Sequence, residues 1–260
     1  SIGAKGMHPR THIVQRLPAF GNGGLDEVEK GRTNFGVVPI ENSSEGTVNI
    51  TLDRFVPSST RICGEIFLEI HHYLLSQEGN KDLIRKIYSH PQAIAQCRNW
   101  LALNLPEASL LEISSTAKAA ELALNDHNCA AIASETTAQI YNLKIVASSI
   151  EDNLSNYTRF LIISREDAPR CGQDKTSLLV FIKDKVGALF EMLGPFAKHK
   201  INLTKIESRP SKKKPWEYIF FIDIHGHRED ANVQAALKEI DEQSQWLKIL
   251  GSYPRGELPE

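Results

Sequence analysis

Polar side chains that could bind an anion and donate protons to it occur in four blocks in the first two thirds of the chain. Hydroxyl and amide groups predominate in these blocks, which are residues 39–53 (PIENSSEGTVNITLD), 89–97 (SHPQAIAQC), 115–116 (ST) and 156–160 (NYTRF). Each block ends or follows an expected strand, so folding could gather all four at one cleft. Spacing alone defines no Ser-His-Asp nucleophile. The residue types by themselves therefore predict a binding site for a polar anion.

The elements that must position these blocks alternate between strands and helices. Short apolar runs at residues 34–40, 65–75, 86–88, 130–132 and 160–163 are expected strands, and residues 92–103 and 117–125 are expected helices. The first run, NFGVVPI, is typical of a buried parallel strand whose carboxyl end opens onto the ENSSEGTVN loop. Ser115 and Ser134 stand at expected helix starts, where serine is a common N-cap. This alternation predicts an α/β fold.

A break in the periodic pattern separates a second segment from the first. In residues 168–175 (APRCGQDK), proline, glycine and charged residues cluster as they do in domain linkers. The elements expected beyond it are a strand at 176–183, a helix at 187–199, strands at 202–207 and 217–224, a helix at 230–243 and a strand at 247–250. This βαββαβ order is the ferredoxin-like pattern. Because the segment offers no obvious nucleophile or base, we expect a binding module.

Composition and charge argue against several classes of protein. Thirty Lys and Arg against 32 Asp and Glu give a formal net charge of -2, which favours neither nucleic acid nor an anionic membrane as a partner. No apolar run approaches the ~20 residues that cross a bilayer, and the first residues lack the apolar core of a secretory signal, so we expect a cytoplasmic protein. The four cysteines are widely spaced, without the short pairings of metal or redox sites, so no metal is expected.

The four blocks, in this order and followed by the ferredoxin-like segment, resemble the prephenate dehydratase family over nearly the whole chain. The resemblance implies a catalytic domain at residues 1–170 with two α/β lobes, similar to periplasmic binding proteins, and an active site in the cleft between the lobes. The chain would cross between the lobes near residues 76 and 153. The resemblance also implies that residues 174–260 form an ACT regulatory domain.

The implied reaction removes carbon dioxide and water from prephenate and yields phenylpyruvate, on the route to L-phenylalanine, without a metal or an organic cofactor. By residue-by-residue matching, Thr158 of the TRF motif protonates the departing hydroxyl. Arg159 beside it is the expected partner for a substrate carboxylate, because guanidinium is always charged and binds carboxylates bidentately. The resemblance places six further residues in the substrate site, namely Asn42, Ser43, Ser89, Gln96, Ser115 and Thr116.

Plainer interpretations of several residues stay open beside this one. Without the resemblance, Thr158 would be a β-branched residue leading into a strand. His90, in an SHP turn, is expected to cap local backbone rather than to act as a base. Cys97 has no base or cation nearby in sequence and is expected to be a packed thiol. Glu41 is a weaker second candidate for the acid.

Two strings in the second segment are similar to the phenylalanine-binding motifs of ACT domains in this family, DKVGALFEML at 184–193 and ESRP at 207–210. The effector-binding residues implied by them are Val186, Gly187, Ala188, Leu189, Glu207, Ser208 and Arg209. L-phenylalanine would then be an allosteric inhibitor, and pairing of ACT domains would give a homodimer or homotetramer. The alternative is that Gly187 only begins an amphipathic helix and that Arg209 ends a strand.

The first residues depart from the family pattern. GAKGMH at 3–8 stands where family members carry Gly-Pro-x-Gly-Thr, and Met7 places a thioether where a hydroxyl donor is expected. An aromatic amino-acid sensor with impaired catalysis is therefore a second hypothesis. A third is that the chain is the dehydratase part of a bifunctional enzyme with a chorismate mutase before Ser1.

Overall fold

The computed structural model describes residues 23–182, 185–211 and 217–259, which fold into two compact units. The first unit combines the described residues up to Leu68 with those from Thr158 onward, and the second unit is Glu69–Tyr157. The atypical segment at residues 3–8, with Met7, lies outside the described residues. Within the described ranges, no helix has the length and apolar character needed to span a membrane.

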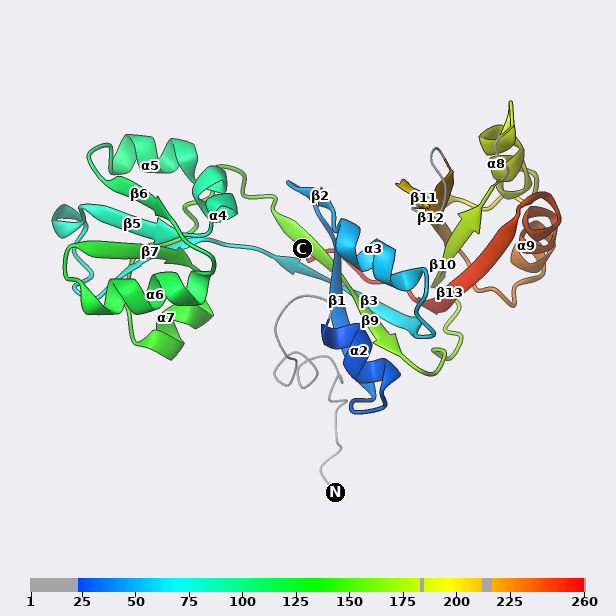
Figure 1. The fold of residues 1–260 in the computed structure, drawn as a ribbon, viewed down its shortest axis with the longest axis horizontal. Helices are drawn as coiled ribbons and strands as arrows, with labels where there is room; N and C mark the ends of the chain where they lie inside the picture. The colour runs from blue at the N-terminus through cyan, green and yellow to red at the C-terminus, as the bar shows by residue number, and fades with distance from the viewer. Residues whose placement is uncertain (1–22, 183–184, 212–216, 260) are drawn as a thin grey trace, which may run out of the picture. The chain divides into compact units, whose positions relative to one another are not determined.

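The second unit is built on a five-stranded sheet in the order β6-β5-β7-β4-β8. Its strands are β4 (Tyr73–Ser76), β5 (Lys86–Ser89), β6 (Ser109–Glu112), β7 (Cys129–Ala133) and β8 (Lys144–Ala147). Helices α4 (Pro91–Gln96) and α5 (Arg98–Asn104) cover one face, and α6 (Thr116–Asn125) and α7 (Glu135–Tyr141) cover the other (Figure 1). Strand β5 is parallel to β6 and β7, and coverage on both faces explains why all five residues of β7 are buried.

The helix expected at residues 92–103 is wrong as a single element, because the structure has two helices that meet at Cys97. The carboxylate of Asp152 accepts hydrogen bonds of 2.9 Å from the backbone N of both Asn99 and Trp100. These donors belong to the first turn of α5, which has no intrahelical acceptor for them. A loop carboxylate distant in sequence thus gives α5 its own start.

The first unit contains a four-stranded sheet in the order β2-β1-β9-β3. Its elements are α2 (Gly23–Glu29), β1 (Phe35–Asn42), β2 (Gly46–Thr47), α3 (Asn49–Phe55), β3 (Arg61–Glu69) and β9 (Tyr157–Ser164). The prediction of a parallel strand at residues 34–40 is wrong, since β1 is antiparallel to both β2 and β9. Strand β2 folds back through a tight turn, and β9 returns from the second unit, so both run opposite to β1. The expected strand at 65–75 is likewise two strands, β3 and β4, in different sheets.

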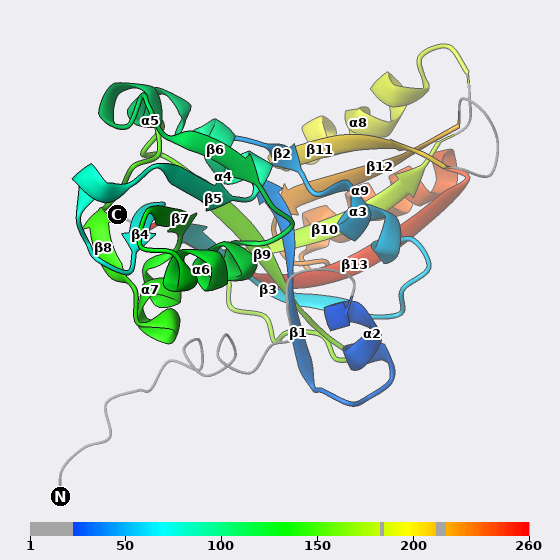
Figure 2. The ribbon, with the colours of Figure 1, turned by 60° about the vertical axis from the view of Figure 1, so that its left-hand side comes forward.

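The C-terminal segment of the first unit has the expected βαββαβ order. Its elements are β10 (Asp174–Phe181), α8 (Ala188–Lys198), β11 (Leu203–Pro210), β12 (Tyr218–His225), α9 (Ala231–Gln243) and β13 (Trp246–Pro254). The strands lie side by side in the order β11-β12-β10-β13, and α8 and α9 cover one face (Figure 2). This strand order with two helices on one face is the ferredoxin-like arrangement.

The other face of this sheet shares a core with the four-stranded sheet. Alternate residues of β10 point to opposite sides, so Leu178 packs with α8 and α9 whereas Leu179 packs with Phe55 of α3. Every residue of β10 except Phe181 is buried. Tyr253 of β13 is fully buried in the same shared core. The two parts of the first unit therefore fold against each other rather than around separate cores.

Candidate active site

Asn42 and Thr158 lie directly opposite each other on β1 and β9. The side-chain Nδ2 of Asn42 donates a hydrogen bond of 2.8 Å to Oγ1 of Thr158. The other end of the amide, Oδ1, accepts hydrogen bonds of 2.9 and 3.0 Å from the backbone N of Ser44 and Glu45. These two bonds fix which end of the amide faces Thr158. The Thr158 oxygen therefore accepts a hydrogen bond and keeps its own proton for donation.

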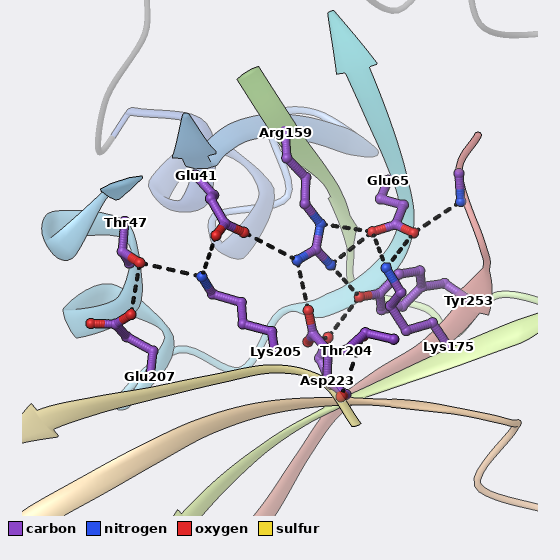
Figure 3. Close-up of polar contacts among 12 residues, drawn as sticks. Glu41, Thr47, Glu65, Arg159, Lys175, Thr204, Lys205, Glu207, Asp223 and Tyr253 are labelled. Carbon is purple, nitrogen blue, oxygen red and sulfur yellow. Dashed lines mark hydrogen bonds and ion pairs between the residues drawn. The ribbon is translucent and has the colours of Figure 1, made fainter. Parts of the chain in front are cut away.

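Arg159 points away from this pair, because side chains alternate across a strand. Its side chain is only 7% exposed, with Nε 2.8 Å from Oε2 of Glu65 and Nη1 2.7 Å from Oδ2 of Asp223 (Figure 3). Burial alone would lower the pKa of Arg159, but the negative charge of Asp223 raises it above its usual value. The guanidinium thus faces carboxylates of the protein itself. Its expected contact with a substrate carboxylate stays a prediction.

Glu41, the second candidate for the acid, also faces the ferredoxin-like sheet. Its Oε1 lies 3.0 Å from Nζ of Lys205, and its Oε2 lies 3.8 Å from Nη1 of Arg159. Ser43, which follows Asn42 in the turn between β1 and β2, is exposed. Glu41 is therefore an ion-pair partner in this structure, and the polar groups that can reach a ligand lie on the Asn42 side of the strands.

Ser89 and Gln96, expected in the substrate site, differ in accessibility within the second unit. Ser89 is fully buried at the end of β5, where its hydroxyl donates to the carbonyl of Ile132. Gln96 is partly exposed, and its Oε1 lies 2.7 Å from Nε2 of His72 and 3.2 Å from Nδ2 of Asn156. The structure therefore places Gln96, but not the hydroxyl of Ser89, where a ligand could reach it.

Ser115 and Thr116 form the start of α6. The Ser115 hydroxyl accepts a hydrogen bond from the backbone N of Lys118, as expected of an N-cap, and Thr116 is exposed. Ser134 caps α7 in the same way. The expected helix starts are therefore confirmed, and that of α6 presents exposed hydroxyl groups.

Neither His90 nor Cys97 has the environment of a catalytic group. His90 is the N-cap of α4, with Nδ1 accepting from the backbone N of Gln92 at 3.3 Å. Cys97 is fully buried, and burial raises the pKa of its thiol to about 12. A thiol that stays protonated at neutral pH is a poor nucleophile. The structural interpretation expected for both residues agrees with this geometry.

One pair of ionisable groups in the second unit was not found from the sequence. Nδ1 of His71 lies 2.6 Å from Oε1 of Glu151, whose other oxygen accepts a hydrogen bond from the backbone N of His72. The hydrogen bond to Glu151 raises the pKa of His71. Burial would raise the pKa of Glu151, but the hydrogen bonds from His71 and His72 lower it overall. The two side chains are 80 residues apart, and no local pattern indicates their contact.

The expected effector residues at the start of α8 surround an exposed apolar surface. Val186 is fully exposed, and Leu189 and Phe190 are 42% and 82% exposed. Gly187 precedes α8 with a φ of 81°, a left-handed conformation that favours glycine. Ala188 is the first residue of the helix. Backbone groups and apolar side chains are thus accessible together, as binding of an amino acid requires.

The ESRP residues on β11 point to two sides. Ser208 is exposed, whereas Glu207 accepts a hydrogen bond of 2.9 Å from Oγ1 of Thr47, and Arg209 pairs with Asp53 at 3.2 Å. Arg209 also lines a cavity of about 250 Å³ between α3 and the ferredoxin-like sheet. The side chains of Glu207 and Arg209 therefore contact the segment that carries the ENSSEGTVN loop, whereas Ser208 lies on the exposed side of β11.

Comparison with known proteins assigns both parts of the chain. Residues 22–168, more than half of the chain, match the family model described as prephenate dehydratase, and residues 176–242 match the ACT domain. The chain belongs to the prephenate dehydratase family. Prephenate dehydratase of Methanocaldococcus jannaschii is 41% identical over 84% of this chain and 80% of its own length.

Longer proteins in the family are also similar to this chain. The bifunctional chorismate mutase/prephenate dehydratase of Aquifex aeolicus is 52% identical over 90% of this chain, which spans 65% of that protein. Among solved structures, the prephenate dehydratase of Arthrobacter aurescens in complex with L-Phe has a TM-score of 0.81 at 38% identity, with 89% of this chain and 78% of that one covered. The two-lobed α/β fold with a C-terminal ACT domain is therefore that of the prephenate dehydratase family.

Proposed function

We propose that this member of the prephenate dehydratase family converts prephenate to phenylpyruvate, carbon dioxide and water. The observation that carries the proposal is the hydrogen bond from Asn42 to Thr158, which leaves the Thr158 proton for donation. Prephenate loses a hydroxyl group, and a hydroxyl leaves far more readily when a positioned donor supplies its proton. Thr158 is the proposed donor.

In the proposed reaction, the bond between the ring and its carboxylate breaks, and carbon dioxide departs. The electron pair moves into the ring and completes the aromatic system, while the carbon–oxygen bond to the hydroxyl breaks. The departing oxygen takes the proton of Thr158 and leaves as water, and solvent returns a proton to Thr158. The protein supplies orientation and hydrogen bonds, which suit this reaction because the substrate provides both leaving groups.

The remaining substrate contacts are proposed from the accessible groups. Ser43, Gln96, Ser115 and Thr116 offer hydroxyl and amide groups for the two carboxylates of prephenate. The hydroxyl of Ser89 supports the sheet through Ile132, so we propose a structural role for it. The second hypothesis, a sensor without catalysis, has no comparable support from the pair of Asn42 and Thr158.

We propose L-phenylalanine as the effector of the ACT domain. Support comes from the related Arthrobacter aurescens enzyme, whose structure is described as a complex with L-Phe, and from the accessible groups at Val186–Leu189 and Ser208. The ligand carboxylate would meet backbone N–H groups beside Gly187, and its ring would meet the apolar side chains. Pairing of ACT domains into a dimer or tetramer and a cytoplasmic location are proposed with it.

Turnover of prephenate by the purified chain tests the proposed function. Phenylpyruvate and carbon dioxide should form in equal amounts, and L-phenylalanine should lower the rate. Binding of L-phenylalanine by a folded protein that forms no phenylpyruvate would contradict the enzyme proposal and support the sensor.

A further inference from the structure

The two residues that flank the Asn42–Thr158 hydrogen bond are both ion-paired to the ACT sheet, the four-stranded sheet β11-β12-β10-β13 of the ACT domain. Glu41 lies opposite Arg159 in the same ladder that places Asn42 opposite Thr158. Arg159 pairs with Asp223 of β12 at 2.7 Å, and Glu41 pairs with Lys205 of β11 at 3.0 Å. Strands β1 and β9 are thus each fixed by the ACT sheet on the face opposite the proposed catalytic pair.

The contact of Arg159 belongs to a buried cluster of two cations and two anions (Figure 3). Glu65 and Arg159 come from the dehydratase strands β3 and β9, and Lys175 and Asp223 come from the ACT strands β10 and β12. Nζ of Lys175 lies 2.8 and 2.9 Å from the two oxygens of Glu65, and all four side chains are 8% exposed or less. Each part therefore pairs its cation with an anion of the other part.

Such a cluster specifies geometry more than it adds stability. Removing charges from water carries a large desolvation penalty, and the attraction between the charges offsets this penalty only when distances and partners are well matched. Here Tyr253 OH lies 3.3 Å from Nη2 of Arg159, and the backbone N of Gly256 donates to Glu65 at 2.9 Å. A shift of either strand would leave a buried charge without its partner. The cluster therefore holds β9 in one register against the ACT sheet.

We propose that Arg159 and Glu41 are positioning residues through which the ACT sheet, by way of Asp223 and Lys205, holds Thr158 and Asn42 at hydrogen-bonding distance. This role rests on the proposed function of Thr158. It gives the ACT domain a part in basal turnover as well as in regulation. An effector that moves β11 or β12 would then also have a direct route to the proton donor.

The pair of Glu41 and Lys205 is the better place to test this, because removing Lys205 leaves Glu41, which is 39% exposed and still lies 3.8 Å from Arg159. We expect Lys205→Met and Glu41→Gln each to lower kcat about 10-fold with KM changed less than about threefold, as for small misplacement of a catalytic group. The double variant should be no slower than the slower single variant, since both changes remove one interaction. Lys205→Arg, which keeps the charge, should retain most of the turnover.

The matched control is Lys198→Met, which removes an exposed ion pair with Glu239 inside the ACT domain. It should leave kcat unchanged. Circular dichroism and Tm verify that each variant is folded at the assay temperature. Unchanged kcat in folded Lys205→Met, or losses that multiply in the double variant, would overturn the positioning role.

A second measurement does not depend on activity. In the 15N-labelled full chain, the side-chain NH₂ signal of Asn42 is identified by its absence in Asn42→Asp. We expect Lys205→Met to shift this signal and Lys198→Met to leave it in place. A shifted signal in a protein without dehydratase activity would contradict the proposed function alone, whereas an unmoved signal in Lys205→Met would overturn the positioning role.

Discussion

The side-chain amide of Asn42 donates a hydrogen bond to the hydroxyl of Thr158, across 116 residues of sequence. Its direction is fixed, because the amide oxygen accepts from the backbone N of Ser44 and Glu45. A hydroxyl that accepts a hydrogen bond becomes a better donor to the next group in the chain of bonds. In the proposed reaction, Asn42 would thereby prepare Thr158 to protonate the leaving hydroxyl.

The direction of this bond can be reversed by Asn42→Asp. An aspartate oxygen can still accept from Ser44 and Glu45, but it has no N–H for Thr158 and would accept the Thr158 proton instead. We expect kcat to fall by about 10²-fold or more, the usual worth of a general acid, in a protein with an unchanged Tm. Ser43→Ala, next to it in the turn, should have a smaller effect. Wild-type turnover by Asn42→Asp would show that this bond plays no part.

Binding of L-phenylalanine should depend on the backbone at Gly187. A β-branched residue is strained at its φ of 81°, so Gly187→Val should shift the backbone that is proposed to hold the ligand. Calorimetric titration should show loss of binding and of inhibition while basal kcat stays within about twofold, as expected away from the catalytic site. Gly194→Ala, with open space around its added Cβ, is the control and should bind normally. Full binding by Gly187→Val would contradict the proposed effector site.

The shared core predicts that the dehydratase and ACT parts of the first unit unfold together. A Cβ added at Gly251 of β13 would lie 2.1 Å from the carbonyl oxygen of Ile62 of β3. We expect Gly251→Ala to lower the free energy of unfolding by about 1–3 kcal/mol or more, because backbone cannot move aside cheaply. Urea unfolding measures the loss, with Gly194→Ala as the tolerated control. Equal stability of both variants would contradict the close contact of β13 with β3.

The pair of His71 and Glu151 predicts a pH dependence of stability. The pKa of His71 is raised in the folded protein. Its contribution to the free energy of unfolding is therefore present below its unfolded pKa of about 6.5 and is lost as pH rises through the folded pKa. The pKa of Glu151 is lowered in the folded protein. Its contribution to the free energy of unfolding is therefore present above its unfolded pKa and is lost as pH falls through the folded pKa. The Tm difference between wild type and His71→Gln should therefore be largest near about pH 5–6 and shrink toward pH 9.

A matched control for the pH experiment is His127→Gln, which removes the exposed pair of His127 and Glu78. Exposed pairs contribute little, so its Tm difference should be small across the same range. A Tm difference for His71→Gln that grows above pH 7 would contradict the assigned ion pair.

The sequence predicted the order of elements well where each element carries its own periodic pattern. The ACT domain is an example, since the helices expected at residues 187–199 and 230–243 contain the whole of α8 and α9. The antiparallel direction of β1 could not be predicted, because it depends on β9, which returns only after the second unit. The burial of Ser89 could not be predicted for a similar reason, since the carbonyl group that accepts its hydrogen bond is on the neighbouring strand β7.

The surroundings of Arg159 were the part of the site that motif matching described least. Its position next to Thr158 suggested one shared site, yet adjacent residues of a strand face opposite sides, and this signal was available from the sequence. Its partners were not available, because Glu65 is 94 residues away and Asp223 belongs to the other domain. Charged residues that alternate along β11, such as Lys205 and Glu207, look like an exposed face in sequence but are half-buried against the dehydratase strands.

The comparison of Thr158→Val with Thr158→Ser tests the central claim most directly. Valine keeps the shape and β-branching but has no proton to donate, whereas serine keeps the hydroxyl and the bond from Asn42. The proposed proton transfer predicts that kcat of Thr158→Val falls by roughly 10²–10⁴ with a smaller change in KM, and that Thr158→Ser retains most of the turnover. Wild-type kcat in a folded Thr158→Val protein, with turnover abolished instead by Thr116→Val, would contradict the assignment of Thr158 as the proton donor.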